Sequence, residues 1–196
     1  MTRKTNHKRI LALDIRPRRF GFVAFEQPDQ LIDWGVKSFR RGVNAVRIPP
    51  RRKLAGLLDE LSPAVVVLNE RVLRVPKKKY KIVAIAQEEA RRRRIAIRTV
   101  PRNALKRAFA GHHRNKDEIA SVLVDRFPEL AMKQPPRRRP WQSEDYRMSV
   151  FDAAALAATY LGRGSIQNRA GLALPQSRDS FLGIKYATAH AVRAVE

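Results

Sequence analysis

The hydrophobic pattern of this chain changes its period near residue 50, and this change constrains the fold more than any other feature. Three apolar segments rich in aromatic and β-branched residues come first, at residues 9–15, 20–25 and 31–39, joined by short links. Such segments predict an antiparallel meander. The first segment is almost continuously apolar, which is typical of a strand covered on both faces.

Helical and strand-like segments alternate after the change. A leucine stripe at three- and four-residue spacing predicts a helix over residues 54–61. The following segments are 64–70 (strand), 80–94 (helix), 95–100 (strand), 103–109 (a helix capped by Asn103), 117–130 (helix) and 149–161 (an alanine-rich helix that Gly162 and Gly164 would end). Alternation of this kind predicts parallel crossover connections. We therefore expect an α/β fold with a mixed five-stranded sheet, antiparallel over its first three strands and flanked by helices.

The domain organisation predicted from this pattern has one core. Residues 1–8 are polar and basic and are expected to form a flexible arm. Residues 9–162 form the predicted domain, and residues 163–196 form a C-terminal extension that is expected to be partly helical. The segment 81–86 is apolar on more than one side, so it suits both the cover of the sheet and a homodimer contact.

Composition limits the class of function. The chain has 41 Lys+Arg against 18 Asp+Glu, a formal net charge of +23, which favours a nucleic-acid partner. It has no cysteine, which excludes a disulfide scaffold, a cysteine zinc site and a thiol nucleophile. No apolar run approaches the roughly 20 residues of a membrane span. We expect a cytoplasmic, nucleoid-associated protein without a membrane partner.

Three carboxylates follow apolar segments. Asp14 lies inside the first strand, Glu70 ends the 64–70 segment, and Asp152 opens the alanine-rich helix. A buried lone carboxylate costs several kcal/mol unless it is paired or binds a cation. If the three converge, their oxygens suit Mg²⁺ or Mn²⁺, and two such ions catalyse phosphodiester hydrolysis. The structural alternative is that Asp152 complements the helix dipole and Glu70 lies in solvent.

Clusters of basic residues without acidic compensation predict a surface that follows phosphates. These contacts would position the nucleic acid without reading its sequence. Trp141 lies in a basic segment and could stack on an unpaired base. The predicted nucleic-acid-binding residues are Arg16, Arg18, Arg19, Arg71, Arg74, Lys77, Lys78, Lys79, Arg137, Arg138, Arg139 and Trp141.

The order of these motifs resembles one group of nucleases. Four motifs are together similar to those of RuvC-type Holliday-junction resolvases, which belong to the RNase H-like superfamily. The motifs are the segment 10–14 (ILALD) followed by Gly21, the segment 65–70 (VVVLNE), the segment 99–101 (TVP) with Lys106, Gly111 and Lys116, and the segment 152–157 (DAAALA). The resemblance covers roughly residues 9–161. It implies that Asp14, Glu70 and Asp152 bind two Mg²⁺ or Mn²⁺ ions. It also implies that Lys106 and Lys116 lie near the scissile phosphate, and that in-line hydrolysis leaves a 5′-phosphate and a 3′-hydroxyl.

Two departures from the group's pattern bear on the site. The group commonly has a further carboxylate three residues before the helical Asp, where this chain has Ser149. Asp145, seven residues before Asp152, could replace it only if the chain bends. The usual Pro-Gly after the first Asp is Ile15-Arg16 here.

The resulting hypothesis is a Mg²⁺-dependent, structure-selective endonuclease that hydrolyses DNA at Holliday or other branched junctions, in DNA recombination or repair. Two alternatives stay open. One is an RNA-processing nuclease of the same fold, because positive charge does not separate RNA from DNA. The other is a non-catalytic nucleic-acid-binding protein that kept the fold, and Ser149 favours that alternative.

Overall fold

The computed structural model describes residues 9–27, 30–39, 49–74, 81–110, 115–139 and 141–166. The strands are β1 (Ile10–Arg16), β2 (Arg19–Gln27), β3 (Gln30–Ser38), β4 (Val65–Asn69) and β5 (Ala96–Val100). The helices are α1 (Pro50–Leu61), α2 (Glu70–Leu73), α3 (Lys81–Arg92), α4 (Arg102–Ala108), α5 (Lys116–Arg126) and α6 (Met148–Ile166), with a 3-10 turn η1 at Pro128–Lys133.

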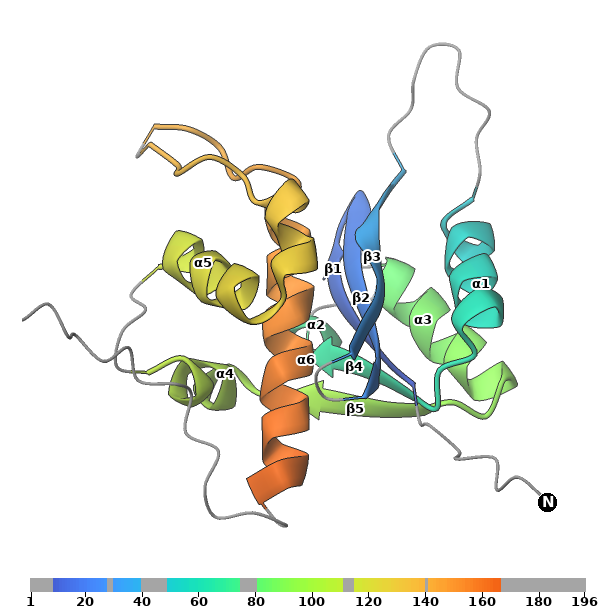
Figure 1. Cartoon of the computed structure of the whole chain (residues 1–196). Coiled ribbons are helices and arrows are strands. Elements are labelled where there is room, and N and C mark those ends of the chain that lie inside the picture. Colours follow the sequence, from blue (N-terminus) through green and yellow to red (C-terminus); the bar gives the residue numbers. More distant parts are fainter. Residues whose placement is uncertain are drawn as a thin grey trace, which may run out of the picture.

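The strands form one five-stranded sheet in the order β3-β2-β1-β4-β5. β1 is antiparallel to β2, and β2 to β3, whereas β4 lies parallel to both β1 and β5. Figure 1 shows α6 with α4 and α5 on one face of this sheet, and α1 with α3 on the other. The predicted mixed α/β architecture is therefore confirmed.

β1 is buried on both faces because its side chains alternate between two cores. Leu11, Leu13 and Ile15 pack in the core under α1 and α3, whereas Ala12 packs in the core under α6. Asp14 has the same parity as Ala12, since successive strand residues point to opposite faces. The carboxylate of Asp14 therefore lies on the α6 side, at the end of a fully covered strand.

Several element bounds differ from those predicted. α4 begins at Arg102 after Pro101, so Asn103 is not its N-cap. α5 ends at Arg126 because Pro128 disfavours helical backbone at Phe127, and the turn η1 follows. α6 continues through Gly162 and Gly164 to Ile166. A helical glycine costs only about 1 kcal/mol relative to alanine, and the packing of the long apolar face of α6 outweighs that cost.

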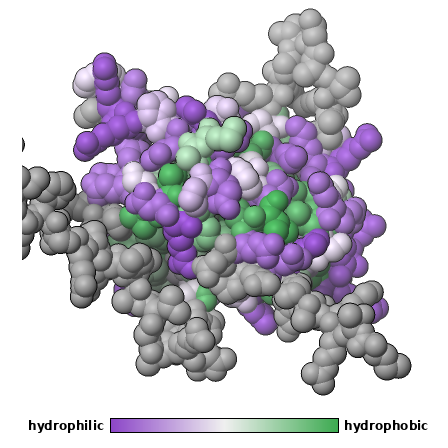
Figure 2. Space-filling view, in the orientation of Figure 1, coloured by the Kyte–Doolittle hydropathy of each residue, from purple (hydrophilic) through white to green (hydrophobic). Residues whose placement is uncertain are grey.

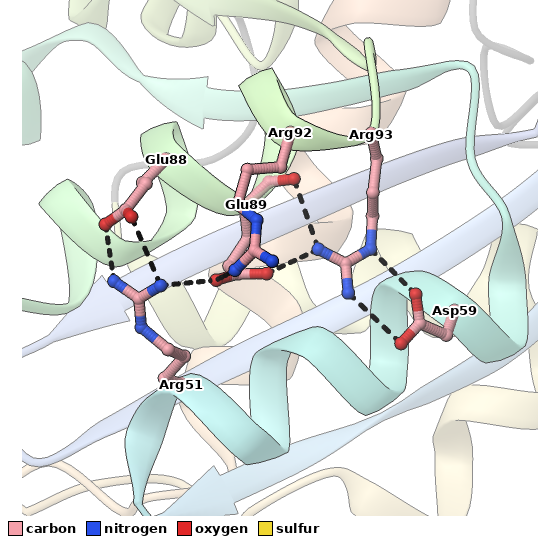
Figure 3. Close-up of polar contacts among 6 residues, drawn as sticks. All are labelled: Arg51, Asp59, Glu88, Glu89, Arg92 and Arg93. Carbon is pink, nitrogen blue, oxygen red and sulfur yellow. Dashed lines mark hydrogen bonds and ion pairs between the residues drawn. The ribbon is translucent and has the colours of Figure 1, made fainter.

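A network of ion pairs joins α1 to α3 (Figure 3). The side chain of Glu89 is 2% exposed and accepts hydrogen bonds from Arg51 on α1, at 2.8 Å, and from Arg93. Arg93 also donates to both carboxylate oxygens of Asp59 on α1, at 2.7 and 3.1 Å. Glu89 is therefore the buried centre of a polar link between the two helices that cover one face of the sheet.

Glu89→Gln is expected to lower the free energy of unfolding by about 1–3 kcal/mol. The substitution removes the negative charge and replaces one of the two acceptor oxygens by an NH2 donor, so an arginine loses a buried hydrogen bond to a charged group. The loss stays moderate because Arg51 is 43% exposed and can turn to water. Urea denaturation measures the change. The matched control is Glu88→Gln, which removes the half-exposed partner of Arg51 and should change stability little. Equal effects of the two variants would contradict a central role of Glu89.

The segment predicted to serve both the sheet and a dimer lies in α3. Ile82, Val83 and Ala86 are buried in the core under α1 and α3, and Ile85 packs against the same core. The cover of the sheet is thus observed, and the homodimer stays a prediction. Within the described residues no helix is long and apolar enough to cross a membrane. The predicted arm, residues 1–8, and nearly all of the extension, residues 167–196, lie outside the described residues.

Candidate functional site

Two carboxylates from opposite ends of the sequence meet where β1 ends against α6. Asp14 comes from β1 and Asp152 from the first turns of α6. The meeting requires that α6 approach the sheet very closely. Gly21 on β2, which pairs with Asp14, makes this possible: a Cβ built on Gly21 would lie 2.1 Å from the carbonyl oxygen of Ser149. The glycine is thus required by the contact between β2 and the backbone of α6.

The close approach of α6 to the sheet brings the Ser149 side chain within hydrogen-bond distance of Asp14. Its hydroxyl is buried and donates a hydrogen bond of 2.6 Å to Oδ2 of Asp14. The residue that stands where the resolvase group commonly has a carboxylate therefore supplies a hydroxyl donor. Asp14 itself is 9% exposed, so this bond is part of what makes the burial of its charge possible.

Arg16 joins the two carboxylates. Its Nε donates to Oδ2 of Asp14 at 2.8 Å, and its Nη2 donates to Oδ2 of Asp152 at 2.6 Å. The same Nη2 lies 3.5 Å from Oε1 of Glu144. Burial alone would lower the pKa of the Arg16 guanidinium, but Asp14, Asp152 and Glu144 raise it above its ordinary value. Arg16 is therefore firmly charged and central to the cluster.

Lys116 supplies a second cation from the start of α5. Its Nζ donates to Oδ2 of Asp152 at 2.7 Å and to Oε2 of Glu144 at 2.9 Å. Burial opposes the charged form, yet these two carboxylates raise the pKa of Lys116 above its ordinary value. Asn115 fixes the start of the helix, because its side chain accepts a hydrogen bond from the backbone N–H of Glu118.

The carboxylates respond differently to this crowding. Burial and the negative charge of Asp14 raise the pKa of Asp152, although Lys116 and Arg16 act in the opposite direction. Burial also opposes the charged form of Glu144, but Lys116, Arg16 and Arg19 outweigh it and lower the pKa of that carboxylate. Of these two carboxylates, Asp152 is thus the one whose charge is less fully compensated.

Glu70 lies at the same end of the sheet but does not join this cluster. The β1–β4 pairing ends at Leu13 with Leu68, so Asn69 rather than Glu70 is level with Asp14. Asn69 caps α2, which begins at Glu70. The Glu70 carboxylate pairs with Arg74, the C-cap residue of the same helix. Among the described residues, no three acidic, His or Cys side chains meet as a metal site would require.

The donor set of the cluster nevertheless fits a divalent cation in kind. Carboxylate oxygens of Asp14 and Asp152 converge on one positive group, and such hard ligands suit Mg²⁺ or Mn²⁺. In this structure that positive group is the guanidinium of Arg16. A metal ion at this place would have to replace the guanidinium.

Glu144 is a member of the cluster that the sequence analysis missed. The chain bends before α6, and the bend directs Glu144, rather than the predicted Asp145, to the site. Asp145 pairs with Arg147 at 2.9 Å, and this pairing lowers the pKa of Asp145. The only sequence signal was the acidic pair that follows a basic, proline-rich segment. Its geometry could not be predicted because that segment has no regular period.

An open groove adjoins the cluster. Its lining includes Lys116 and Glu144 together with the arginines Arg137, Arg138 and Arg139. Trp141 is 77% exposed, and the guanidinium of Arg139 lies 5.8 Å from the centre of its ring. Predicted phosphate-binding side chains are thus continuous with the carboxylate cluster.

The remaining predicted residues are distributed over several elements. Arg18 is exposed in the β1–β2 turn, Lys106 is exposed on α4, and Arg71 and Arg74 are exposed at α2. Arg19 is half-buried near Glu144, and its Nε has no hydrogen-bond partner among the described residues. Lys77, Lys78 and Lys79 lie outside the described residues. In Figure 2, hydrophilic residues surround a central band of hydrophobic residues on the face in view.

The sequence matches no protein-family model and no curated protein. The structure is similar to that of Thermus thermophilus RuvC in complex with a Holliday junction substrate, with a TM-score of 0.54 at 16% identity over 82% of this chain and 96% of RuvC. It is also similar to the fowlpox virus resolvase in complex with Holliday junction DNA, with a TM-score of 0.50 at 14% identity over 79% of this chain and 99% of the resolvase. These similarities, together with the sheet order, show that the chain has the RNase H-like fold of the RuvC-type resolvases.

Proposed function

We propose that this protein is a divalent-metal-dependent endonuclease that cuts branched DNA. The observation that carries the proposal is the meeting of Asp14 and Asp152 around one cation, at the end of the central strand. The strong positive charge of the chain and the RuvC-like fold support a nucleic-acid substrate. The structures with this fold that contain Holliday junction DNA favour branched DNA over other substrates.

Each residue of the cluster has a role in this proposal. A bound Mg²⁺ or Mn²⁺ would supply Lewis-acid stabilisation of the phosphodiester. Asp14 and Asp152 would hold the ion, and the Ser149 hydroxyl orients the carboxylate of Asp14. Glu70 would contribute, as the ligand of a second ion, after leaving Arg74. Lys116, and Lys106 on the neighbouring helix α4, would stabilise the negative charge that develops on the phosphate.

The groove beside the cluster would bind the DNA backbone. Arg137, Arg138 and Arg139 line it with Lys116, so a strand along the groove would pass directly to the carboxylates. Phosphate contacts of this kind fix the register of the nucleic acid without reading its sequence. The exposed indole of Trp141 offers a stacking surface for a base that a junction leaves unpaired.

One observation favours a second candidate, a non-catalytic protein that binds branched nucleic acid. Arg16 pairs with both Asp14 and Asp152, so these residues already form an ion-pair network that includes no metal ion. Both candidates predict that the protein binds a junction in EDTA, and they differ in whether it cuts the junction when a metal ion is present.

A cleavage panel separates the candidates. Four-way, flap, duplex and single-stranded DNA, and a matched RNA junction, are incubated with the protein in EDTA, Mg²⁺ or Mn²⁺. We expect cleavage of the four-way or flap DNA only in the presence of a metal ion, with 5′-phosphate ends. Tight junction binding without cleavage in either metal would instead establish the binding protein, and preferential cleavage of the RNA junction would establish an RNA-processing enzyme.

A further inference from the structure

Arg16 has an unusual position for an arginine. It is the last residue of β1 and lies two residues after Asp14, so both side chains point to the α6 face of the sheet. The short distance between them allows Nε to bind Asp14 while Nη2 reaches Asp152. The guanidinium is thus held by the strand at the point where the two carboxylates converge.

A guanidinium at this point excludes a divalent ion. The Oδ2 atoms of Asp14 and Asp152 both accept hydrogen bonds from Arg16, so they are engaged on the side that they share. An ion between them would also meet the like charge of Arg16 at close range. The cluster has a net charge of −1, because it contains three carboxylates and two cations. Its net charge would be −2 if Arg16 left. The members are Asp14, Glu144, Asp152, Arg16 and Lys116.

Arg16 can leave without unfolding the domain. Its side chain is 33% exposed, and the next residues, Pro17 and Arg18, are exposed in the β1–β2 turn. A phosphate group offers the guanidinium the paired oxygens that its planar fork recognises. Nucleic-acid backbone that enters beside the cluster is therefore a competing partner for the Arg16 guanidinium.

We propose that Arg16 is an internal counter-ion that keeps divalent metal out of the free protein and releases the carboxylates when nucleic-acid phosphate takes its guanidinium. The inference rests on the proposed metal-dependent function. It adds that metal binding and substrate binding are coupled, so that each strengthens the other by the same factor. Coupling of this kind would confine an active metal centre to the protein–DNA complex.

The first test measures metal binding without DNA. Mn²⁺ is titrated into the free protein and followed by the electron paramagnetic resonance signal of unbound Mn²⁺. Arg16→Met keeps much of the length of the side chain and removes its charge, and it should bind Mn²⁺ at least about tenfold more tightly than the wild type. Arg107→Met, an exposed position on α4, makes the same change in net charge and should leave the affinity within about twofold of the wild type.

The second test measures the phosphate contact without metal. In EDTA, Arg16→Met should bind a four-way junction more weakly than Arg107→Met does, with a salt dependence reduced by about one phosphate contact. Thermal denaturation checks that the variant folds. Arg16→Met should melt below the wild type in EDTA, because two carboxylates lose their shared partner, and Mn²⁺ should restore its melting temperature more than that of the wild type.

The outcomes distinguish this inference from the proposed function. Equal Mn²⁺ affinity of the wild type and Arg16→Met, with cleavage of junctions intact, would overturn the counter-ion role and leave the nuclease standing. Absence of Mn²⁺ binding in both proteins, with and without DNA, would overturn both. Junction binding in EDTA that is equal for Arg16→Met and Arg107→Met would overturn the transfer of Arg16 to phosphate.

Discussion

Gly21→Ala is expected to destabilise the protein by about 3 kcal/mol or more. The new methyl group would lie 2.1 Å from the carbonyl oxygen of Ser149 and 2.3 Å from its carbonyl carbon. Both atoms belong to the backbone, so no change of rotamer relieves the contact, and β2 must separate from α6. Insertion of a methyl group into a close-packed core typically costs about 1–3 kcal/mol, and a backbone contact this short lies at or beyond the upper end.

The effect should reach the carboxylates as well as the stability. Displacement of α6 would lengthen the bond between Ser149 and Asp14, which now measures 2.6 Å, and would move Asp152 with the helix. Urea denaturation gives the change in free energy, and a cleavage assay at a temperature where the variant stays folded gives the effect on the site.

Gly56→Ala is the matched control. A Cβ at Gly56 meets nothing within 4 Å, and the residue lies in α1, where alanine is favoured over glycine. This variant should be more stable than the wild type by about 0.5–1 kcal/mol. A Gly21→Ala protein as stable as the wild type would mean that α6 does not approach β2 as closely as described.

The fold was predictable because the pattern of each strand is local. Segments 9–15 and 64–70 are apolar on both faces, and the structure places them side by side as parallel β1 and β4. The predicted ends of α5 and α6 were wrong, because each depends on residues or packing outside the segment itself. α6 passes through two glycines because its apolar face is buried, and α5 stops early because of Pro128.

The site was predictable only in part for a related reason. Asp14 and Asp152 were recognisable because each is a carboxylate in apolar surroundings, and the structure brings them to one guanidinium. The partners of these carboxylates depend on the bend of residues 141–147 and on how far the Arg16 side chain reaches. The hydrophobic pattern of the sequence predicts neither of these. The sequence therefore predicted three carboxylates that converge, whereas Asp14, Glu144 and Asp152 meet two cations and Glu70 pairs with Arg74.

Asp14→Asn is expected to reduce the single-turnover rate of junction cleavage by more than about a hundredfold. Even residues one step removed from a metal ion cost about 10- to 100-fold in activity or metal affinity, and Asp14 is proposed as a direct ligand. The new amide keeps the shape of the carboxylate but is a weaker ligand and no longer attracts a cation. Junction binding in EDTA should persist, because the arginines of the groove are unchanged.

Stability separates loss of a ligand from loss of the fold. The amide oxygen introduced by Asp14→Asn could still accept from Ser149 or Arg16, and Arg16 keeps Asp152, so the expected loss is only about 1–2 kcal/mol. Part of that loss is offset, because Asp14 raises the pKa of Asp152 and its removal lets that carboxylate ionise more readily. The fall in the pKa of Asp152, followed by NMR titration, reports directly on the contact between the two residues.

The control for Asp14→Asn is Asp33→Asn, which changes a half-buried carboxylate on β3. Burial raises the pKa of Asp33, as it raises the pKa of Asp152. This variant should cut junctions at the wild-type rate, because β2 separates β3 from β1 and the Asp33 side chain accepts its hydrogen bond from the backbone N–H of Trp34. If Asp14→Asn also cut at that rate, the carboxylates of β1 and α6 would be a structural ion-pair network and the metal-dependent mechanism would fail. If Asp14→Asn lost cleavage but kept junction binding in EDTA and lost only about 1–2 kcal/mol of stability, Asp14 would act in the chemistry rather than in the fold.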